Sequence, residues 1–452
     1  MHAPPTSLEV IREGGVRVRD DPRDDRRHRL RSAGVRIFIW HGYLLAGTGS
    51  NVFARELARQ WGNAGHDVTV FSQEPNPGDY DLGGAATVRP DVGGLLPVFV
   101  IDRYEGYRVQ QVQATSREEL DAWVEANAAA IRERLPADLV VAGHLILGGP
   151  VGAATGARYV VLAHGSELEY SMRGNAELSA WGAEAAAGAA AVIVGSEHIR
   201  NVVEEVCGPV ERMHAVPPGV DIEVWRPQAR ADALAALVAE AHQDPPNPGN
   251  ASERLPDSGN AERLAEFLAG DTPTVVYFGK LIENKGVQLL IAALREVGCR
   301  GVIVGFGPDR AEFERQAEGL PVLFTGPLEH RHLIHLCALA DAAVVPSIFP
   351  EAFGMVAAEA AAAGCPPIVA HHSGLAEIAQ GLERFYPAGK GRLASFPSGD
   401  AAELAERLNS ILALPAAERA ELRAAARAAV VELWSWKSVA ERILAAGIAP
   451  VL

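Results

Sequence analysis

Cysteine is scarce in this chain of 452 residues, and the few cysteines lie far apart. The thiols are those of Cys207, Cys299, Cys337 and Cys365. No two of them have the close spacing of a zinc or iron–sulfur motif. The sequence therefore predicts buried free thiols in a reducing compartment and no metal site built on cysteine.

Long, uninterrupted hydrophobic runs are also absent, so we expect no membrane-spanning helix and no stable membrane insertion. The N-terminus lacks the apolar core of a secretory signal, because arginines and aspartates are interspersed over residues 12–31. We predict a disordered tail over residues 1–34. The predicted location is the cytoplasm, and a lipid partner would add peripheral contact with the inner face of the membrane.

An excess of basic residues is likewise lacking. The chain has 41 Lys and Arg against 57 Asp and Glu, which gives a formal net charge of −16. A general nucleic-acid binder would normally be basic, so no nucleic acid is expected as a partner. The content of 48% hydrophobic and 22% charged residues is typical of a folded globular protein.

Short apolar runs divide the chain into two similar halves. In the first half, VRIFIW (35–40) is followed by a glycine loop, an amphipathic stretch and DVTVFS (67–72), which predicts strand, loop, helix and strand of a parallel sheet. Further predicted strands follow at 138–143, 159–165 and 191–196. A second set lies at 274–279, 301–307, 321–326, 341–347 and 367–372.

This pattern predicts an α/β protein with two Rossmann-like, doubly wound parallel-sheet domains that face a cleft. We predict an N-terminal domain over 35–218, to which a C-terminal helix over 434–452 packs back. A linker with a disordered insertion is expected over 219–272, because 243–260 is rich in Pro, Asn, Gly and Ser. The C-terminal domain is predicted over 273–433.

Two loops have the composition of a phosphate site. In GTGSN (47–51), glycines before a helix can bring backbone N–H groups close to a phosphate, although a plain tight turn is the alternative. A dinucleotide fingerprint would place a third glycine where Val52 stands, which makes NAD a weaker hypothesis. In YFGKLIENKG (277–286), Lys280 and Lys285 can converge on one diphosphate, or both can be solvated loop lysines.

Two glutamates stand eight positions apart in the nearly uncharged stretch PEAFGMVAAEAAAAGCP (350–366). Glu351 precedes a predicted helix, whose first N–H groups, at Phe353, Gly354 and Met355, favour a phosphate or a developing oxyanion. Glu359 lies inside that helix, where its carboxylate can accept two hydrogen bonds from a diol such as ribose. In isolation, two surface glutamates on a helix would be the simpler interpretation.

Several motifs in order resemble retaining GT-B glycosyltransferases of family 4, the group 1 glycosyl transferases. They are the E-x7-E element at Glu351 and Glu359, VPPGVD (216–221), FGKLIENKG (278–286), VGFGP (304–308) and SGLAEI (373–378). The resemblance runs from about Val35 to the C-terminus, without the 243–260 insertion. The stretch GTGSNVFARELA is similar to members related to sucrose-phosphate synthase and to inositol-phosphate-transferring enzymes.

The resemblance implies a nucleotide-diphosphate sugar donor, such as a UDP-, GDP- or ADP-sugar, and a hydroxyl acceptor that the sequence does not identify. It implies that Lys280 and Lys285 hold the diphosphate and that Glu359 takes the ribose. Glu351 and the amides of Phe353, Gly354 and Met355 would take the sugar. His164 would reach the sugar from the N-terminal half, and Gly49 would lie near the phosphates.

His41, at the end of the first strand, is a further candidate for contact with the acceptor or the sugar. Lys280 stands where the family often has arginine, so a point charge replaces a bidentate fork. The implied catalytic residues are His164, Lys285 and Glu351, with no metal and no cofactor. The implied reaction is a metal-independent, front-face transfer of a hexose. The alternatives are another GT-B enzyme, such as an epimerase or a phosphorylase, and a non-catalytic sugar-nucleotide-binding protein.

Overall fold

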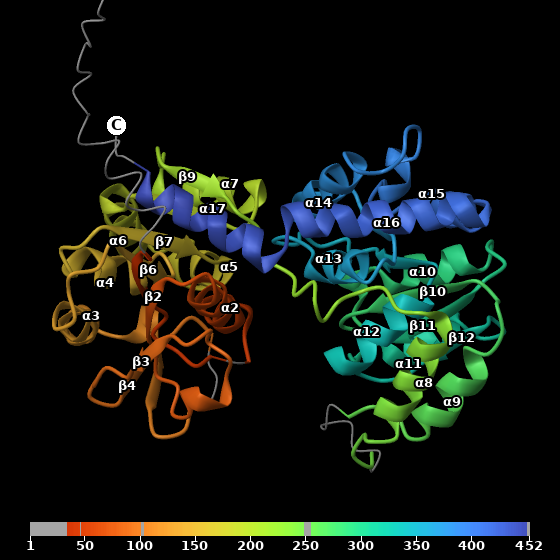
Figure 1. The fold of residues 1–452 in the computed structure, drawn as a ribbon, viewed down its shortest axis with the longest axis horizontal. Helices are drawn as coiled ribbons and strands as arrows, with labels where there is room; N and C mark the ends of the chain where they lie inside the picture. Colours follow the sequence, from red (N-terminus) through yellow and green to blue (C-terminus); the bar gives the residue numbers. More distant parts are fainter. Residues whose placement is uncertain (1–33, 46, 101–103, 248–254, 450–452) are drawn as a thin grey trace, which may run out of the picture.

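A computed structural model describes residues 34–45, 47–100, 104–247 and 255–449. The chain forms two α/β halves that lie side by side, and the polypeptide crosses between them twice (Figure 1). The predicted tail and residues 248–254 of the predicted insertion lie outside the described residues, apart from Gly34 at the end of the tail.

The N-terminal half is built on a seven-stranded parallel sheet in the order β3-β2-β1-β6-β7-β8-β9. Its strands are β1 (Arg36–Trp40), β2 (Asp67–Phe71), β3 (Ala86–Val88), β6 (Leu139–Gly143), β7 (Tyr159–Ala163), β8 (Ala191–Val194) and β9 (Met213–Ala215). A separate pair consists of β4 (Leu95–Val98) and β5 (Arg108–Gln111). Its helices are α2 (Gly49–Asn63), α3 (Arg117–Arg132), α4 (Gly148–Ala154), α5 (Gly165–Glu167), α6 (Ala176–Gly188) and α7 (Glu197–Cys207), with short turns η1 (Pro77–Asp79), η2 (Val112–Ala114) and η3 (Leu168–Met172).

The C-terminal half repeats this plan with a six-stranded parallel sheet in the order β12-β11-β10-β13-β14-β15. Its strands are β10 (Thr274–Phe278), β11 (Arg300–Val304), β12 (Val322–Phe324), β13 (Ala342–Val345), β14 (Pro367–Ala370) and β15 (Ser395–Phe396). Its helices are α8 (Arg230–Ala241), α9 (Asn260–Phe267), α10 (Val287–Leu294), α11 (Arg310–Gln316), α12 (His330–Leu339), α13 (Met355–Ala362), α14 (Ser373–Glu383), α15 (Ala401–Leu412) and α16 (Ala416–Leu433), with turns η4 (Glu283–Lys285) and η5 (Gly391–Ala394).

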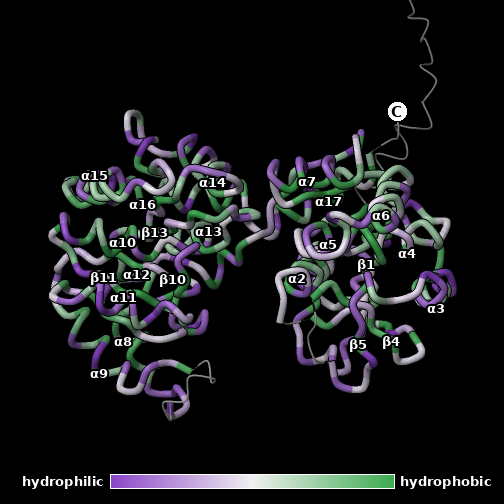
Figure 2. The backbone as a smooth tube through the Cα atoms, turned by 180° about the vertical axis from the view of Figure 1, so that it is seen from behind, coloured by the Kyte–Doolittle hydropathy of each residue, from purple (hydrophilic) through white to green (hydrophobic). Residues whose placement is uncertain are grey.

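The central strands of both sheets are mostly apolar because helices cover both of their faces. Every residue of β6, β7, β10 and β11 is buried. Figure 2 shows the hydrophobic stretches inside each half, while α3 at the surface carries a hydrophilic side. Two parallel sheets of this kind confirm the predicted fold class.

Each sheet reverses its strand order at one point, between β1 and β6 in the first half and between β10 and β13 in the second. Loops that leave such neighbouring strands run to opposite faces of the sheet and open a crevice at the carboxyl ends. The sites of an α/β sheet lie in that crevice. Residues that follow β1, β6, β10 and β13 are therefore the first to inspect for chemistry.

The last helix, α17 (Trp436–Ile448), returns to the N-terminal half and packs on α2 (Figure 1). The ring of Trp436 lies edge to face with Phe53 at a centroid distance of 5.2 Å. A side chain on Gly219 would lie 2.5 Å from the same indole, which explains a glycine where the chain crosses between the halves.

The structure differs from the sequence prediction over residues 219–272, which were expected to be a linker and an insertion. Helices α8 and α9 lie there, and Ala233, Leu237 and Leu264 are fully buried in the core of the C-terminal half. The apolar positions recur every four residues, as in a helix with one buried face. The surrounding Pro, Asn and Gly residues masked this period in the sequence.

Three of the cysteines, Cys299, Cys337 and Cys365, are buried, and Cys207 is half-buried. All four are free thiols. Within the described part of the chain, no helix combines the length and the apolar character needed to cross a bilayer.

Candidate active site

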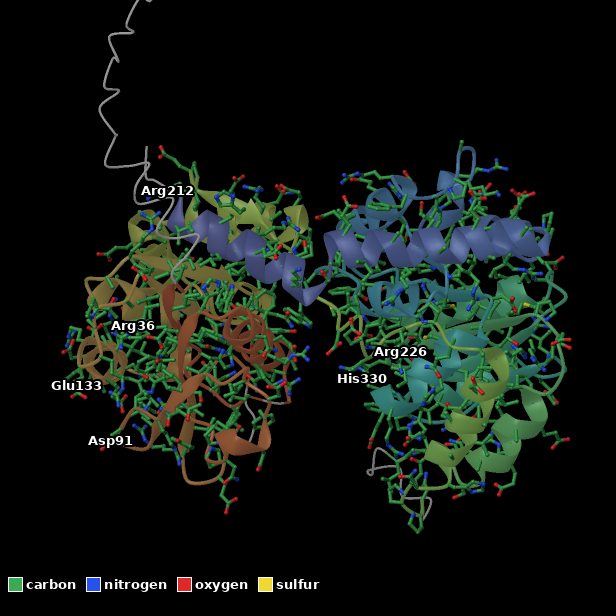
Figure 3. All side chains as sticks on the ribbon, viewed as in Figure 1. Arg36, Asp91, Glu133, Arg212, Arg226 and His330 are labelled. Atoms are coloured by element: carbon green, nitrogen blue, oxygen red, sulfur yellow. The ribbon has the colours of Figure 1, made fainter. Side chains whose placement is uncertain are left out.

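A cavity of about 590 Å³ lies between the two halves, at the carboxyl ends of the strands. Its N-terminal wall includes residues of the loop before α2, the ends of β6 and β7, and Trp436 of α17. Its C-terminal wall includes Phe353, Met355 and Glu359 around the start of α13, and His330. Figure 3 shows His330 on the side of the C-terminal half that faces the N-terminal half.

The ammonium group of Lys285 contacts the carboxylate of Glu351. The side chains keep 30% and 23% of their surface exposed, so both remain accessible to a ligand. A half-exposed ion pair of this kind contributes little to stability, because water screens it. The pair lies after β10 and β13, at the reversal of the sheet, so a role in ligand binding fits it better than a role in stability.

Close packing of two loops creates this pair. Gly286 has φ +72°, and a side chain there would lie 1.9 Å from the carbonyl oxygen of Pro346. The carbonyl of Asn284 accepts the N–H groups of Ile348 and Phe349 at 3.0 and 3.2 Å. The loop before α10 is thereby fixed against the loop after β13, which carries Glu351.

The start of α13 is held by α14. The N–H of Glu351 donates to Ser373 Oγ at 2.9 Å, and the N–H of Gly374 donates to the carbonyl of Glu351 at 3.0 Å. A side chain on Gly374 would lie 2.6 Å from Phe353 Cα. Gly354 has φ +118° and precedes the first helical residue, Met355. The first N–H groups of a helix have no partner within it, so they are available here to an anion.

Glu359 is the fifth residue of α13, and its side chain is 13% exposed. Burial raises the pKa of its carboxyl group to about 8. The Nε2 atom of His330 lies 3.7 Å from Glu359 Oε1. A carboxyl group in this environment is largely neutral at pH 7 and gains its charge readily when a hydrogen-bond donor arrives.

Lys280 lies on the loop after β10 and is exposed. Its carbonyl accepts the hydroxyl of Tyr277 at 2.8 Å, which fixes the backbone and leaves the side chain free to turn. Lys280 does not line the cavity. The structure thus brings Lys285 and Glu351 together and places Glu359 in the cavity wall, while Lys280 stands apart.

On the N-terminal side, His164 follows β7 and lines the cavity. The backbone N–H of His164 donates to Glu167 Oε1 at 2.6 Å. Burial lowers the pKa of the imidazole to about 3. Gly49 opens α2 and also lines the cavity, and a side chain there would meet nothing within 4 Å. His164 is therefore a neutral hydrogen-bonding group, and Gly49 leaves open space.

His41, a candidate from the sequence for contact with the acceptor or the sugar, lies behind the cavity wall. It is only 1% exposed and does not line the cavity. Its Nε2 atom lies 2.7 Å from Asn51 Oδ1, and Asn51 is the residue that reaches the cavity wall. Burial and the nearby His144 lower the pKa of His41 to about 3. His41 therefore positions the side chain of Asn51, which lines the cavity.

Sequence reasoning missed two residues beside this site, His144 and Glu167. His144 follows β6 and lines the cavity, and its Nδ1 atom lies 3.1 Å from Glu167 Oε2. Glu167 is completely buried. The signal in the sequence was the Gly-His or His-Gly step that ends both predicted strands, at 143–144 and 164–165.

No group of three or more His, Cys, Asp or Glu side chains within the described ranges is placed to hold a metal ion. The ionisable side chains in the cavity wall are His144, His164, His330 and Glu359, with Tyr43 and Tyr104. The charged pair, Lys285 and Glu351, stands in the loops beside it.

Two family models match the chain in the order of its halves. The model described as Glycosyltransferase Family 4 matches residues 47–224, and the model described as Glycosyl transferases group 1 matches residues 260–429. The chain belongs to the group 1 glycosyl transferases. This confirms the predicted family and makes the protein a glycosyltransferase.

Two curated relatives illustrate the family. A D-inositol 3-phosphate glycosyltransferase of Xylanimonas cellulosilytica is 28% identical over 364 residues, which span 73% of this glycosyltransferase and 77% of the relative. A GDP-mannose-dependent alpha-(1-6)-phosphatidylinositol dimannoside mannosyltransferase of Mycobacterium tuberculosis is 36% identical over 188 residues, which span 38% of this chain and 44% of the relative.

Solved structures share the fold at lower identity. Sucrose-phosphate synthase from Thermosynechococcus elongatus is 23% identical, with a TM-score of 0.56 over 90% of this chain and 97% of that one. The Anabaena protein HepE in complex with UDP is 17% identical, with a TM-score of 0.62 over 90% and 98% of the two chains. These neighbours support the GT-B fold of the glycosyltransferase.

Proposed function

We propose that this glycosyltransferase moves a hexose from a nucleotide-diphosphate sugar to a hydroxyl group of an acceptor, with retention at the anomeric carbon. The contact of Lys285 with Glu351, beside the start of α13 and the buried Glu359, carries the proposal. It combines one cation for a diphosphate with two carboxyl groups for hydroxyls. The relatives named for GDP-mannose and the neighbour solved with UDP and glucose support a donor of this class.

In this proposal, Lys285, with Lys280 turned inward, neutralises the diphosphate, and the N–H groups from Phe353 to Met355 complete the anion site. Glu359 accepts the two ribose hydroxyls. Glu351 releases one contact with Lys285 and accepts hydroxyls of the sugar. His164 approaches the sugar from the other half, and Gly49 leaves room for the phosphates.

The transfer proceeds on one face of the sugar. The bond from the anomeric carbon to the diphosphate oxygen breaks, and the bond to the acceptor oxygen forms on the same face. The proton of the acceptor hydroxyl passes to the departing phosphate oxygen. Negative charge therefore grows next to Lys285 and the start of α13, which stabilise it, and no metal is required for this step.

A thermal-shift screen tests the donor. The full chain is heated with UDP-, GDP-, ADP- and TDP-glucose, the matching mannose donors where they exist, and NAD as a control, each with and without magnesium. We expect one nucleotide series to raise Tm, because a ligand that binds only the folded state stabilises it. The shift should be lost in Glu359→Ala and Lys285→Ala. A shift with NAD alone, or with none of the compounds, would contradict the proposal.

A further inference from the structure

One buried side-chain pair in the N-terminal half has no part in donor binding as proposed. His144 follows β6 at the reversal of the sheet, and its ring lines the cavity. His144 as a residue is only 2% exposed, and it is part of the cavity wall. The histidine stands where a ligand bound to the first half would lie.

The backbone of His144 is strained. Its φ is +73°, and within the described ranges only Leu147 and Ser373 share a positive φ among residues other than glycine. The N–H of His144 donates to the carbonyl of Leu162 at 2.8 Å, and its carbonyl accepts the N–H of Gly149 at 3.0 Å. Strained residues that are held this firmly gather at functional sites.

The partner of His144 is a carboxylate with no exposure to water. Glu167 Oε1 accepts from the backbone N–H of His164 at 2.6 Å and from the backbone N–H of Leu145 at 3.4 Å. Its Oε2 lies 3.1 Å from the ring atom Nδ1 of His144. A buried carboxyl group is costly to ionise unless donors surround it. Burial raises the pKa of Glu167 to about 7.

This contact assigns the proton of the imidazole. With Glu167 ionised, Nδ1 carries the hydrogen that the carboxylate accepts, and Nε2 keeps its lone pair. Nε2 makes no hydrogen bond to any residue in the described part of the chain. The lone pair of Nε2 is therefore a hydrogen-bond acceptor at the cavity wall.

Aromatic rings surround the imidazole of His144. The ring of Phe99 lies 4.7 Å from that of His144, and the ring of Tyr43 lies 5.6 Å from it at 88°. Tyr43, Phe99 and Tyr104 all line the cavity. Such a wall suits a ring-sized molecule with an apolar face, held in place by a few polar atoms.

We propose that Nε2 of His144, held by Glu167, accepts a hydrogen bond from a non-reacting hydroxyl of the acceptor, whose ring lies against Phe99 and Tyr43. The inference rests on the proposed function, because it assigns the second substrate of the same site. No proton is transferred through the imidazole. The pair positions the acceptor, while the reacting hydroxyl turns to the sugar.

Nuclear magnetic resonance of ¹⁵N-labelled histidine tests the pair without any donor. At pH 8, above the pKa of Glu167, the Nε2 signal of His144, identified by its loss in His144→Asn, should be that of an unprotonated nitrogen. Titration with phenyl β-D-glucoside as the probe should shift it saturably. In Glu167→Gln the amide donates to Nδ1, so the proton moves to Nε2 and the response disappears. A proton on Nε2 in the wild type, or no saturable response, would overturn the proposal.

Kinetics then separate positioning from folding. With the sugar nucleotide that raises Tm most, the KM for phenyl β-D-glucoside should rise at least tenfold in Glu167→Gln. The donor KM and the rate of nucleotide release with water alone should stay within twofold. If Glu167→Gln lowered the rate of transfer to the glucoside and the rate of nucleotide release with water alone to the same extent, the role of Glu167 would be structural and the proposal would be overturned.

His332→Asn is the matched control. His332 is also fully buried beside a carboxylate, with Nε2 3.1 Å from Asp244 Oδ1, but it lies outside the cavity. It should lower stability and leave the KM for the glucoside unchanged. Failure of every nucleotide in the thermal-shift screen would count against the donor, whereas the resonance titration decides on His144 alone.

Discussion

The two halves share one strand plan but carry different chemistry at the same place. In the N-terminal half, the strand ends carry His41, His144 and His164, whose pKa values are all lowered to about 3, chiefly by burial. In the C-terminal half, the equivalent loops carry the half-exposed contact of Lys285 with Glu351. The imidazoles of the first half are thus neutral, whereas the loops beside the second wall carry a charged pair.

This difference matches the two substrates of a transfer reaction. A nucleotide diphosphate brings charge that needs cations and helix N-termini, and the C-terminal half places Lys285 beside the start of α13. An acceptor hydroxyl brings no charge, and neutral imidazoles with aromatic rings suffice for it. Because the folds are alike, side chains at the sheet reversals distinguish the halves, as function resides in sites and not in folds.

The largest expected effect comes from removing charge from the C-terminal wall. Lys285→Ala and Glu351→Ala should each lower kcat on the order of 10²–10³-fold, because Lys285 stabilises the negative charge that develops in the transition state and Glu351 holds hydroxyls of the sugar. The half-exposed pair contributes little to folding, so Tm without ligand should change by no more than a few degrees. Steady-state kinetics and calorimetry of the same samples provide both measurements.

Lys390→Ala is the control for this change. Lys390 Nζ lies 2.6 Å from Glu418 Oε2, so it forms a comparable ion pair outside the cavity. Its kinetics should match those of the wild type. If Lys390→Ala and Lys285→Ala lost activity to the same extent, the contrast between the two walls would have no functional meaning.

A smaller effect is the pH dependence of stability that Glu359 causes. Its pKa is raised to about 8 by burial, so the folded state binds a proton that the unfolded state has lost between about pH 4.5 and 8. The free energy of unfolding therefore falls as pH rises through this window. Glu359→Gln removes this loss and should be more stable than the wild type at pH 9, by roughly 1–3 kcal/mol, and equally stable at pH 5.

Donor affinity should change in the opposite direction. If the ionised carboxylate takes the ribose diol, the Kd of the wild type falls as pH rises from 6 to 8 and then levels off, because more of the protein is in the binding form. In Glu359→Gln, donor binding should be weaker and independent of Glu359 ionisation. Isothermal titration at four pH values measures this, and an unchanged wild-type Kd would show that Glu359 binds the donor in its neutral form.

Local sequence patterns were sufficient to predict the buried strands of both sheets and the glycine turns, but not the short strands β3, β4, β5 and β15. They were sufficient because the predicted strands are mostly apolar runs and a tight turn such as that at Gly286 requires a glycine close to a backbone. They could not predict that His144 meets Glu167, since 23 positions separate them and β7 brings them together. They also misjudged α8, whose buried face consists largely of alanine and gives a weak hydrophobic period.

The smallest expected effect concerns the contact between the halves. Glu377 of α14 accepts the N–H groups of Glu197 and His198, at 3.1 and 3.3 Å, where α7 of the other half begins. A carboxylate at a helix N-terminus is favourable, and here it joins the charged wall to the neutral one. Burial raises the pKa of Glu377, whereas the hydrogen bonds from the N–H groups of Glu197 and His198 favour its ionised form.

Glu377→Ala should loosen this contact and leave each half folded. We expect the donor KM to rise about three- to tenfold, as the loss of roughly 1 kcal/mol at a helix cap implies, with a small decrease in kcat. X-ray scattering should show a larger radius of gyration for the free variant. Glu383→Ala is the control, because Glu383 is exposed on the same helix. An increase in radius without a change in KM would mean that the two walls act on their substrates independently, and that the contact serves only to hold the halves together.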